Sequence, residues 1–477
     1  MASLSFTEFW ARGYRSLRGV EIRDLKQYNV FYGPNGSGKS NVLAAMRTLL
    51  QLAQCAATAP HGGDGHGALE AAGRALESGY LRADELCMRE PSRTLVLGAA
   101  FRAGAPQCIE PLGLLKLSEL SVEVTFDWAL RDAPRLEISG LRWLGPQHGA
   151  KGDLLRLWTD PWPEGTEVHI VLRGGRALGQ QEFRRAIAHL LVDVLPRQAY
   201  HLIEADRMPG REPPNAATLL HGGRAFSMQD HLRRGWIAPG LLAASKDEEI
   251  GVRDSLEKLR KFLEGEPLRR PRFDPVEIGS TRAAQLRERL QAADGEPRDV
   301  PLDLAGLGVV QIYSILAQAL LSGARCIGLE EPEAHLHAPT TGLQLRQLLQ
   351  RLVAEQHVDQ LFVATHSNLF DLDPMGYFDF SLDDSGCTLV QRRGLDVLDE
   401  QHLYEPGPAK HALQLLLQYL PAEEVVFRRP EDGAPVTAGA MLLLLESRDR
   451  KALDFLRDVT GAALRSVRAK ANRPAGA

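Results

Sequence analysis

Hydrophobic positions near the start of the chain follow two different periods. Residues 4–32 alternate between apolar and polar side chains in two short stretches that end in "YNVFYG", a pattern typical of a strand that enters a turn. After the turn "GPNGSGKSN", apolar residues recur at helical spacing from Val42 to Ala53. This part predicts a strand, a glycine-rich loop and a helix in succession. Residues 56–79 are rich in Gly and Ala and predict a loose connection.

The middle of the chain predicts a different architecture. Between residues 95 and 175, β-type stretches such as "LVLGAAF", "LSVEVTFDW", "RLEISGLRWLG" and "EVHIVLR" alternate with Gly and Pro, which favours an antiparallel meander. Residues 181–195 predict a helix, and "AYHLIEA" predicts a strand. Residues 207–300 show helical patterns only in "SLEKLRKFLEG" and "RAAQLRERLQA". We expect a short helical insertion there, because a long coiled coil needs sustained heptads.

The last third returns to regular periodicity. The segment "LAGLGVVQIYSILAQALL" predicts a helix with one apolar stripe. It is followed by the predicted strand "RCIGLE", the predicted helix "LQLRQLLQRLV" and the predicted strand "QLFVATHS". A strand, a helix and a strand in this order imply parallel pairing with a crossover. The sequence therefore predicts an α/β fold.

Composition and charge limit the class of protein. The chain has 477 residues, of which 44% are hydrophobic and 25% charged, as in ordinary globular proteins. A formal net charge of −5 provides no overall basic field, so any contact with nucleic acid would need a local patch. The five cysteines lack a CxxC pair, which fits reduced thiols in a cytosol. No signal-peptide pattern or membrane-length apolar run is found, so we expect a soluble cytoplasmic protein.

The loop "GPNGSGKS", from Gly33 to Ser40, matches the pattern GxxxxGK[ST] between a predicted strand and a predicted helix. Its glycines allow backbone amides to turn toward phosphate oxygens, and the start of the helix adds a partial positive charge. We expect Lys39 to bridge the terminal phosphates and the Ser40 hydroxyl to bind Mg²⁺. The alternative is a glycine turn that caps a helix and leaves the lysine exposed.

The stretch "GLEEPEAHLH" places Glu330, Glu331 and Glu333 where a buried strand ends. Two like charges about 4 Å apart repel by roughly 4 kcal/mol at an effective dielectric constant of about 20, so a cation is expected nearby. The loop with Ser40 should bring Mg²⁺ and nucleotide to this end of the sheet. We expect Glu330 to hold the metal and Glu331 to polarise the attacking water. The alternative is an acidic surface turn that opens a helix.

Three histidines follow these predicted strands. His366 comes directly after "LFVAT", so its imidazole is placed to reach the terminal phosphate, and a purely structural role is the alternative. His335 and His337 have HxH spacing, but no second ligand cluster supports a metal site. We interpret their loop as one that communicates between two subunits.

Five motifs in order resemble the ABC-type ATPase heads of the SMC, RecF and OLD group, often labelled AAA family ATPases: "GYRSLRGVEI", "GPNGSGKSN", "LAGLG", "LEEPEAHLH" and "ATHS". The resemblance covers residues 5–55 and 300–372. It implies a P-loop NTPase with a mostly parallel core sheet, an antiparallel β meander and a short helical insertion. It also implies an ATP hydrolase that uses ATP and Mg²⁺, and a head-to-head homodimer, or a higher homo-oligomer, that closes over two ATP molecules.

The resemblance assigns roles to residues of this chain. Tyr14 to Leu17 would lie near the adenine, Glu330 and Glu331 would form Walker B, and His366 would be the switch histidine. The signature loop, which touches ATP held by the second subunit, would be Ala305, Gly306, Leu307 and Gly308. The nucleotide-binding residues would be Arg15, Gly33, Pro34, Asn35, Gly36, Ser37, Gly38, Lys39, Ser40 and Asn41.

Several positions depart from the transporter-type pattern. Ala305 replaces the serine of LSGGQ, so this loop offers only backbone amides. Glu330 stands where transporters usually have Asp, and no Q-loop glutamine is identified. The expected segments are an N-terminal head part (1–206), a helical insertion or lid (207–300), a C-terminal head part (301–395) and a C-terminal helical extension (396–477).

The leading hypothesis is an ATPase whose dimerisation over ATP acts in DNA repair or antiphage defence. Too few residues follow Glu446 for the Toprim nuclease of OLD proteins, so we expect a separately encoded effector such as a nuclease. One alternative is an ATP-dependent scaffold or sensor with little turnover. Another is a transporter ATPase subunit, which predicts an LSGGQ signature and a compact head. Basic clusters at 269–272 and 428–429 are either contacts to DNA or solvated surface.

Overall fold

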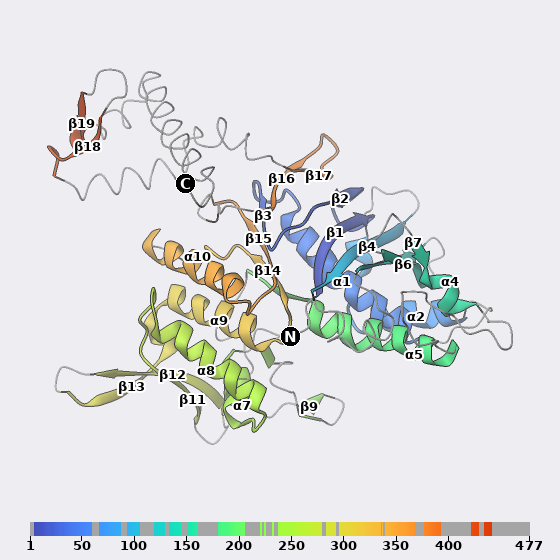
Figure 1. Cartoon of the computed structure of the whole chain (residues 1–477), viewed down its shortest axis with the longest axis horizontal. Coiled ribbons are helices and arrows are strands. Elements are labelled where there is room, and N and C mark those ends of the chain that lie inside the picture. Colours follow the sequence, from blue (N-terminus) through green and yellow to red (C-terminus); the bar gives the residue numbers. More distant parts are fainter. Residues whose placement is uncertain are drawn as a thin grey trace, which may run out of the picture. The chain divides into compact units, whose positions relative to one another are not determined.

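The computed structural model divides the chain into two compact units, Met1–Arg392 and Arg393–Ala477, which are described separately (Figure 1). The residues that the structure describes are 4–59, 66–86, 93–104, 119–128, 133–144, 151–160, 180–205, 220–221, 224–225, 231–232, 237–278, 283–291, 295–334, 336, 339–367, 370, 376–392, 421–428 and 434–440. The predicted strand "EVHIVLR" and most of the predicted C-terminal extension lie outside these ranges.

The core sheet of the first unit has the strand order β17-β16-β3-β15-β14-β8. Neighbouring strands from β8 to β16 pair in parallel, and β17 pairs antiparallel with β16, so the predicted mostly parallel sheet is confirmed. Strands β8, β14 and β15 are apolar along nearly their whole length, as expected for strands covered on both faces. The strands are β3 (Tyr28–Tyr32), β8 (Tyr200–Ile203), β14 (Cys326–Glu330), β15 (Gln360–Thr365), β16 (Gly376–Leu382) and β17 (Thr388–Arg392).

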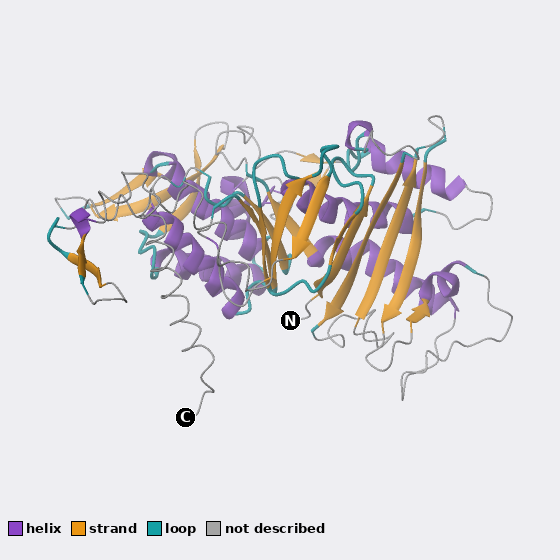
Figure 2. Ribbon diagram, turned by 90° about the horizontal axis from the view of Figure 1, so that it is seen from above, coloured by secondary structure: helices purple, strands orange, loops and turns teal. Residues whose placement is uncertain are grey.

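The second sheet is antiparallel, with the order β2-β1-β4-β5-β6-β7, and its strands are seen beside those of the core sheet in Figure 2. The predicted meander is confirmed, because β4, β5, β6 and β7 pair in succession. Along β5, buried and partly exposed residues alternate, which leaves one face to the core. The strands are β1 (Leu4–Arg12), β2 (Val20–Ile22), β4 (Thr94–Ala103), β5 (Glu119–Asp127), β6 (Arg135–Leu144) and β7 (Lys151–Asp153).

Helices α1 (Lys39–Ala57) and α2 (His66–Glu77) pack against the second sheet, and α1 also contacts the core sheet. The expectation of a loose connection across 56–79 is therefore wrong for residues 66–77. Ala71, Ala72 and Ala75 of α2 are fully buried, and their small side chains let the helix lie close to its neighbours. One apolar cluster joins α1 to both sheets through aromatic residues such as Phe6, Phe31 and Phe362.

The region between the two halves of the head contains helices and a third sheet. Helices α7 (Ile237–Lys246) and α8 (Ile250–Glu264) are followed by β11 (Phe273–Ile278), β12 (Ala283–Gln291) and β13 (Pro297–Pro301). The helix predicted from "RAAQLRERLQA" is therefore wrong. Its residues are good helix formers, but β12 is the central strand and pairs with both neighbours. The expected helical insertion thus also contains a three-stranded sheet.

The remaining elements connect these layers. Predicted helical residues near 181–195 form α5 and the π-helix η3. The predicted helices after residue 300 are confirmed as α9 and α10. The second unit contains the paired strands β18 (Val425–Arg428) and β19 (Pro435–Thr437). Other elements are η1 (Ala83–Glu85), α4 (Leu154–Thr159), α5 (Gln180–His189), η3 (Leu190–Ala199), β9 (Leu220–His221), β10 (Arg224–Ala225), η5 (Leu302–Ala305), α9 (Leu307–Leu321) and α10 (Pro339–Ala354).

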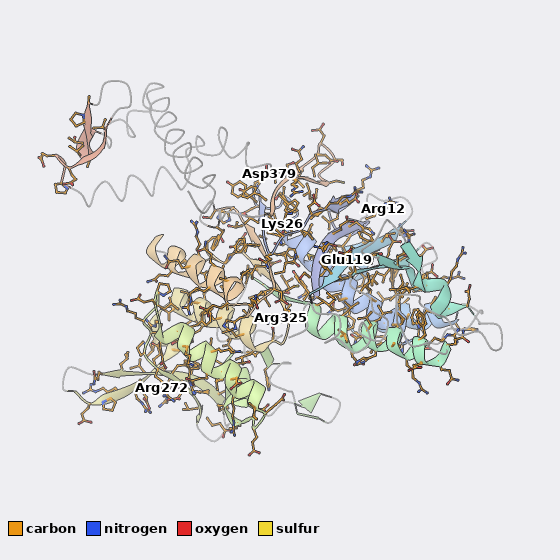
Figure 3. All side chains as sticks on the ribbon, viewed as in Figure 1. Arg12, Lys26, Glu119, Arg272, Arg325 and Asp379 are labelled. Atoms are coloured by element: carbon orange, nitrogen blue, oxygen red, sulfur yellow. The ribbon has the colours of Figure 1, made fainter. Side chains whose placement is uncertain are left out.

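Polar contacts fix the amino-terminal end of the core sheet. Arg325, labelled in Figure 3, precedes β14 and forms an ion pair with Asp359, with 2.5 Å between Nη2 and Oδ1. It also donates to the carbonyls of Gln356 and His357. These bonds hold the start of β14 beside the start of β15, so that the opposite ends of the two strands also lie together. Among the described residues, no helix is long and apolar enough to cross a membrane.

Candidate nucleotide-binding site

The phosphate loop lies between β3 and the first turn of α1. Gly36 and Gly38 have φ angles of 81° and 98°, a left-handed conformation that glycine adopts without steric cost. A Cβ on Gly38 would lie 2.0 Å from Thr388 Oγ1, and one on Gly33 would lie 2.3 Å from the carbonyl oxygen of Phe380. The loop is therefore enclosed by the β16–β17 hairpin, and only glycine fits at these two contacts.

Lys39 lies inside this loop and is nearly buried. Its Nζ donates to the carbonyl oxygens of Gly33, at 2.7 Å, and Pro34, at 2.8 Å. Burial lowers the pKa of Lys39, and the negative charges of Glu331 and Glu333 oppose that shift. The two segments are separated by about 290 residues in the sequence, yet their charges interact in the fold.

A buried hydroxyl in the loop lacks a partner. Ser37 is 1% exposed, and its Oγ has no hydrogen-bond partner within the described part of the chain. Buried polar atoms are usually paired in native proteins, so an unpaired one in a glycine loop fits a ligand with hydrogen-bond acceptors. Together with the left-handed glycines and the lysine, this atom fits the phosphates of a nucleotide.

Glu330, the last residue of β14, faces the start of α1. It accepts a hydrogen bond from the Ser40 side chain and another from the Ala205 amide, at 3.4 Å. Burial raises the pKa of Glu330, and these two hydrogen bonds oppose that shift. A hydroxyl and a carboxylate in contact are a donor set that suits Mg²⁺, which keeps several water ligands. No cluster of three or more His, Cys, Asp or Glu side chains in the described ranges could hold a metal ion, so nucleotide and water would supply the other ligands.

Glu331 and His366 follow the adjacent strands β14 and β15. The Glu331 amide donates to the carbonyl of Ala364 at 2.8 Å, which ties the two strand ends together. Glu331 has a φ of 39°, a strained backbone conformation of the kind that clusters at functional sites. His366 Nδ1 lies 4.0 Å from Glu331 Oε1, and both side chains are partly exposed. The predicted water-activating residue and the predicted switch histidine are thus neighbours.

Arg15 is fixed at the edge of the site. Its guanidinium donates to Asn41 Oδ1 at 3.2 Å and pairs with Glu85 Oε1 at 2.6 Å. Partial burial is the largest single effect and acts to lower the pKa of Arg15, but the bond to Glu85 and the charges of Glu85 and other neighbours together raise it. Tyr14 and Leu17 on either side of this segment are buried in the core. Glu85 has no assigned role in the sequence analysis, because no motif marks it.

Two further residues of the site were missed from the sequence. The hydroxyl oxygens of Thr388 on β17 and of Ser16 lie 2.7 Å apart. The Asn41 side-chain amide donates to the same Ser16 oxygen at 2.7 Å. Glu204 follows β8 and pairs with Arg47 of α1 at 2.7 Å. The sequence predicted a strand in "AYHLIEA". It did not predict that this strand would pair in parallel with β14, which places its end beside Glu330.

The predicted signature loop lies at the start of α9. Gly306 has a φ of 94°, and the flanking Leu304 and Leu307 are 74% and 41% exposed. Within the described residues, no hydrogen bond or ion pair joins residues 302–308 to the phosphate loop of the same chain.

Other predicted contacts have different outcomes. His335 and His337 lie outside the described residues, as does Arg429. Arg270 is not a solvated cation, because it donates to both oxygens of the buried Glu288. Arg270 is therefore an internal partner rather than a contact for a DNA backbone.

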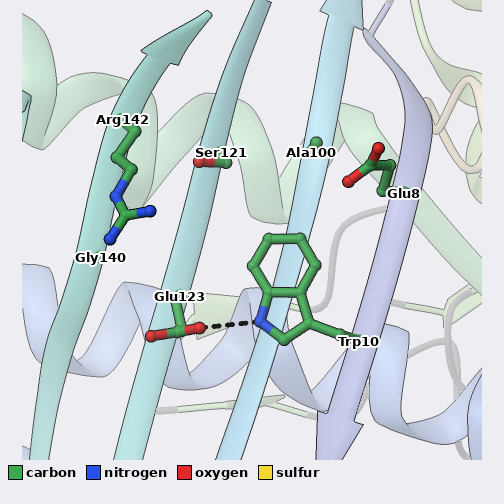
Figure 4. Close-up of a pocket in the computed structure, with 7 residues that line it drawn as sticks. All are labelled: Glu8, Trp10, Ala100, Ser121, Glu123, Gly140 and Arg142. Atoms are coloured by element: carbon green, nitrogen blue, oxygen red, sulfur yellow. Dashed lines mark hydrogen bonds between the residues drawn. The ribbon is translucent and has the colours of Figure 1, made fainter. Parts of the chain in front are cut away.

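A separate hollow lies on the face of the second sheet (Figure 4). Trp10 Nε1 donates to Glu123 Oε2 at 2.8 Å, and Ser139 donates to Oε1 of the same carboxylate at 3.0 Å. A Cβ on Gly98 would lie 2.2 Å from the Trp10 ring, so the indole rests directly on the backbone. The hollow is lined by Glu8, Trp10, Ala100, Ser121, Glu123, Gly140 and Arg142. None of these residues belongs to the nucleotide site.

Comparisons with known proteins support the assignment of the phosphate loop. Residues 28–76 match the family model described as "AAA domain, putative AbiEii toxin, Type IV TA system". No curated protein matches the chain.

Solved structures similar to the chain include three heads of SMC proteins. One is the Smc head bound to the C-winged helix domain of ScpA, with 13% identity and a TM-score of 0.45 over 82% of this chain and 98% of that one. The SMC head domain from Thermotoga maritima has 12% identity and a TM-score of 0.37, over 82% and 100%. The Smc head from Pyrococcus furiosus with the C-terminal domain of ScpA has 10% identity and a TM-score of 0.41, over 82% and 97%.

The matched segment contains β3, the phosphate loop, α1 and most of α2. The parallel order β8-β14-β15-β3-β16 places the ends of β3, β14 and β15 at one edge of the core sheet. The chain therefore has the P-loop NTPase fold, and the segment that contains its phosphate loop is similar to the AAA domain family.

Proposed function

We propose that the protein is an ATP hydrolase that uses Mg²⁺ and dimerises over ATP. The observation that carries this proposal is the meeting of the lysine loop with the acidic end of β14. Ser40 bonds to Glu330, and Lys39 interacts with the charges of Glu331 and Glu333. A triphosphate with its metal ion supplies the negative and positive charges that these groups lack.

The residues then have separate tasks. Lys39 would exchange the carbonyls of Gly33 and Pro34 for the terminal phosphates. Ser40 and Glu330 would hold Mg²⁺, which neutralises charge on the phosphate oxygens when bound.

Hydrolysis requires an activated water. Glu331 would accept a proton from the water while the water oxygen forms a bond to the terminal phosphorus. The bond between that phosphorus and the bridging oxygen breaks, and ADP and phosphate are the products. His366 would contact the terminal phosphate from the neighbouring strand end. The 4.0 Å separation of Glu331 and His366 supports action at one phosphorus atom.

The dimer is proposed from the signature loop. Gly306 and Gly308 have no side chain, so their backbone amides would be able to approach a phosphate held by a second copy. Leu304 beside that loop and Leu307 within it are exposed apolar residues, and a second copy would cover them.

We also propose a role in DNA repair or antiphage defence with a separately encoded effector such as a nuclease. The matching family description names the AbiEii toxin and a type IV TA system. The match covers only residues 28–76, so it supports nucleotide binding more directly than this biological role.

Two substitutions test the enzyme proposal. Lys39→Ala should abolish ATP binding, because the loop loses its only side-chain cation. Glu331→Gln should bind ATP but not hydrolyse it, and should accumulate as a dimer. Binding is measured with a fluorescent ATP analogue, turnover by phosphate release, and mass by light scattering. A Gln variant that hydrolyses ATP at the parental rate would show that Glu331 does not activate the water.

The same measurements separate an enzyme from a scaffold or sensor. A scaffold would bind ATP and dimerise, yet the parental protein and Glu331→Gln would release phosphate equally slowly. Turnover should be measured with and without double-stranded DNA. Stimulation by DNA that is lost in Glu331→Gln would support the proposed role on nucleic acid.

A further inference from the structure

Glu333 is a third carboxylate of the acidic stretch, and neither its spacing nor the proposed mechanism gives it a task. It lies in the turn after β14, with a side chain that is 13% exposed. Its Oε1 accepts hydrogen bonds from the Thr365 hydroxyl and from the His366 amide, at 3.3 Å. The same oxygen lies 3.6 Å from His366 Nδ1. Oε1 of Glu333 therefore contacts three groups at the end of β15: the Thr365 hydroxyl, the His366 amide and the His366 ring.

The second oxygen of Glu333 is buried and has no hydrogen-bond partner among the described residues. Burial of an unpaired carboxylate oxygen is unfavourable, and burial raises the pKa of Glu333. A glutamine would accept the same bonds from Thr365 and the backbone without burying a charge. A purely structural role thus explains the hydrogen bonds but not the charge.

The imidazole of His366 is the group that can use this charge. Two carboxylates lie beside it: Glu331 at 4.0 Å and Glu333 at 3.6 Å from Nδ1, and both also interact with the charge of Lys39. Glu333 is the closer acid and is held in place by two additional bonds, whereas Glu331 is more exposed. The geometry therefore pairs His366 with Glu333 and leaves Glu331 available to water.

We infer that Glu333 is a positioning residue that orients the His366 ring, so that Nε2 faces the terminal phosphate. This inference rests on the proposed ATP hydrolysis. A carboxylate near Nδ1 fixes the orientation of an imidazole ring. Nε2, on the far edge of the ring, is then directed away from Glu333 and is available to contact a phosphate oxygen.

The test uses Glu333→Gln in the full-length protein. This variant keeps an acceptor oxygen for Thr365 and the His366 amide but removes the charge. We expect KM for ATP to remain within about twofold and kcat to fall on the order of 10- to 100-fold, as for other residues that orient a functional histidine. A merely structural role would lower the melting temperature of the variant without separating kcat from KM.

A matched control exists elsewhere in the chain. Glu355 lies 3.3 Å from His357, another carboxylate–imidazole pair, outside the nucleotide site. Glu355→Gln should leave kcat unchanged. Thermal melting of each variant without nucleotide shows whether it is folded. Glu333→Asp provides a second variant that retains the charge; it should lower kcat less than Glu333→Gln does.

A double-mutant cycle checks that Glu333 acts through the histidine. His366→Ala with Glu333→Gln should be no slower than His366→Ala alone. Additive losses, or a parental kcat in Glu333→Gln, would overturn the inference. These results are distinct from failure of the proposed function, in which Lys39→Ala and Glu331→Gln would match the parental protein.

Discussion

Lys39, Glu330 and Glu333 share one property: burial pushes each toward its neutral form. The pKa of Lys39 is lowered, and the pKa values of Glu330 and Glu333 are raised, with burial as the largest cause in each case. Perturbed groups of both signs that face one another are typical of functional sites. The site without ligand is therefore electrostatically unfavourable, and a ligand that carries both phosphates and a cation would relieve it.

The Glu330→Gln variant tests, at a single residue, whether the buried charges make the site unfavourable without a ligand. The folded-state pKa of Glu330 lies above its ordinary value of 4.5, so the stability that its protonated form contributes is present below that value and is lost as pH rises through the folded-state pKa. The variant should melt at a higher temperature than the parental protein at pH 8, with a smaller difference at pH 4. MgATP should raise the melting temperature of the parental protein more than that of the variant. Glu257→Gln, on the exposed side of α8, is the control, and a difference independent of pH would contradict the argument.

At the scale of elements, β12 shows how tertiary contacts override local preference. Glu288 of β12 is buried and accepts hydrogen bonds from Arg270 and from Tyr313 of α9, the latter at 2.6 Å. Strands β12 and β13 also pack against η5, which precedes the signature loop. This charged cluster ties the third sheet to α9 and so fixes the segment on which the predicted signature loop is carried.

Removing the Glu288 carboxylate should therefore lower the stability of the protein. Glu288→Ala leaves the Arg270 charge partly buried without its partner, which should lower the free energy of unfolding by about 3–5 kcal/mol. Tyr313→Phe removes one hydrogen bond to that carboxylate and should cost about 1–3 kcal/mol. Urea denaturation measures both values. Asp299→Ala removes an exposed ion pair of β13 with Arg289 and should leave the stability unchanged; equal losses in all three would refute the assignment.

At the scale of the whole first unit, one buried amide joins the two large sheets. Gln360 of β15 is 1% exposed, and its Oε1 accepts from the Phe6 amide at 2.8 Å. Its Nε2 donates to the carbonyls of Phe6 and Lys26, both at 2.8 Å. The side chain thus pairs with the backbone of β1 much as a neighbouring strand would.

Gln360→Ala should leave buried backbone groups of Phe6 without partners. Each unsatisfied group costs about 1–3 kcal/mol, so the free energy of unfolding should fall by roughly 2–5 kcal/mol. Chemical denaturation followed by circular dichroism would measure the loss. Gln350→Ala changes an exposed glutamine of α10 and should be nearly neutral. A Gln360→Ala variant as stable as Gln350→Ala would mean that the two sheets do not depend on this contact.

The strongest elements of the fold were predictable because their signals are local. Core strands such as β14 and β15 are continuous apolar runs, and the phosphate loop has a fixed spacing of Gly, Lys and Ser between a strand and a helix. The edge where β3, β14 and β15 end followed from parallel pairing, which brings Ser40 to Glu330. Strand β12 was not predictable, since its helix-forming residues become a strand only when both neighbours pair with it.

The sequence by itself determined the strand–loop–helix unit, the acidic strand end and the parallel order that unites them, because short-range periodicity and spacing encode each one. Only the tertiary structure decided that Glu85 holds Arg15, that Thr388 reaches Ser16, and that Glu333 contacts His366. These contacts join side chains on separate elements, and no local pattern specifies which of many polar residues will meet. The physical reason is that long-range packing, rather than chain periodicity, selects polar partners.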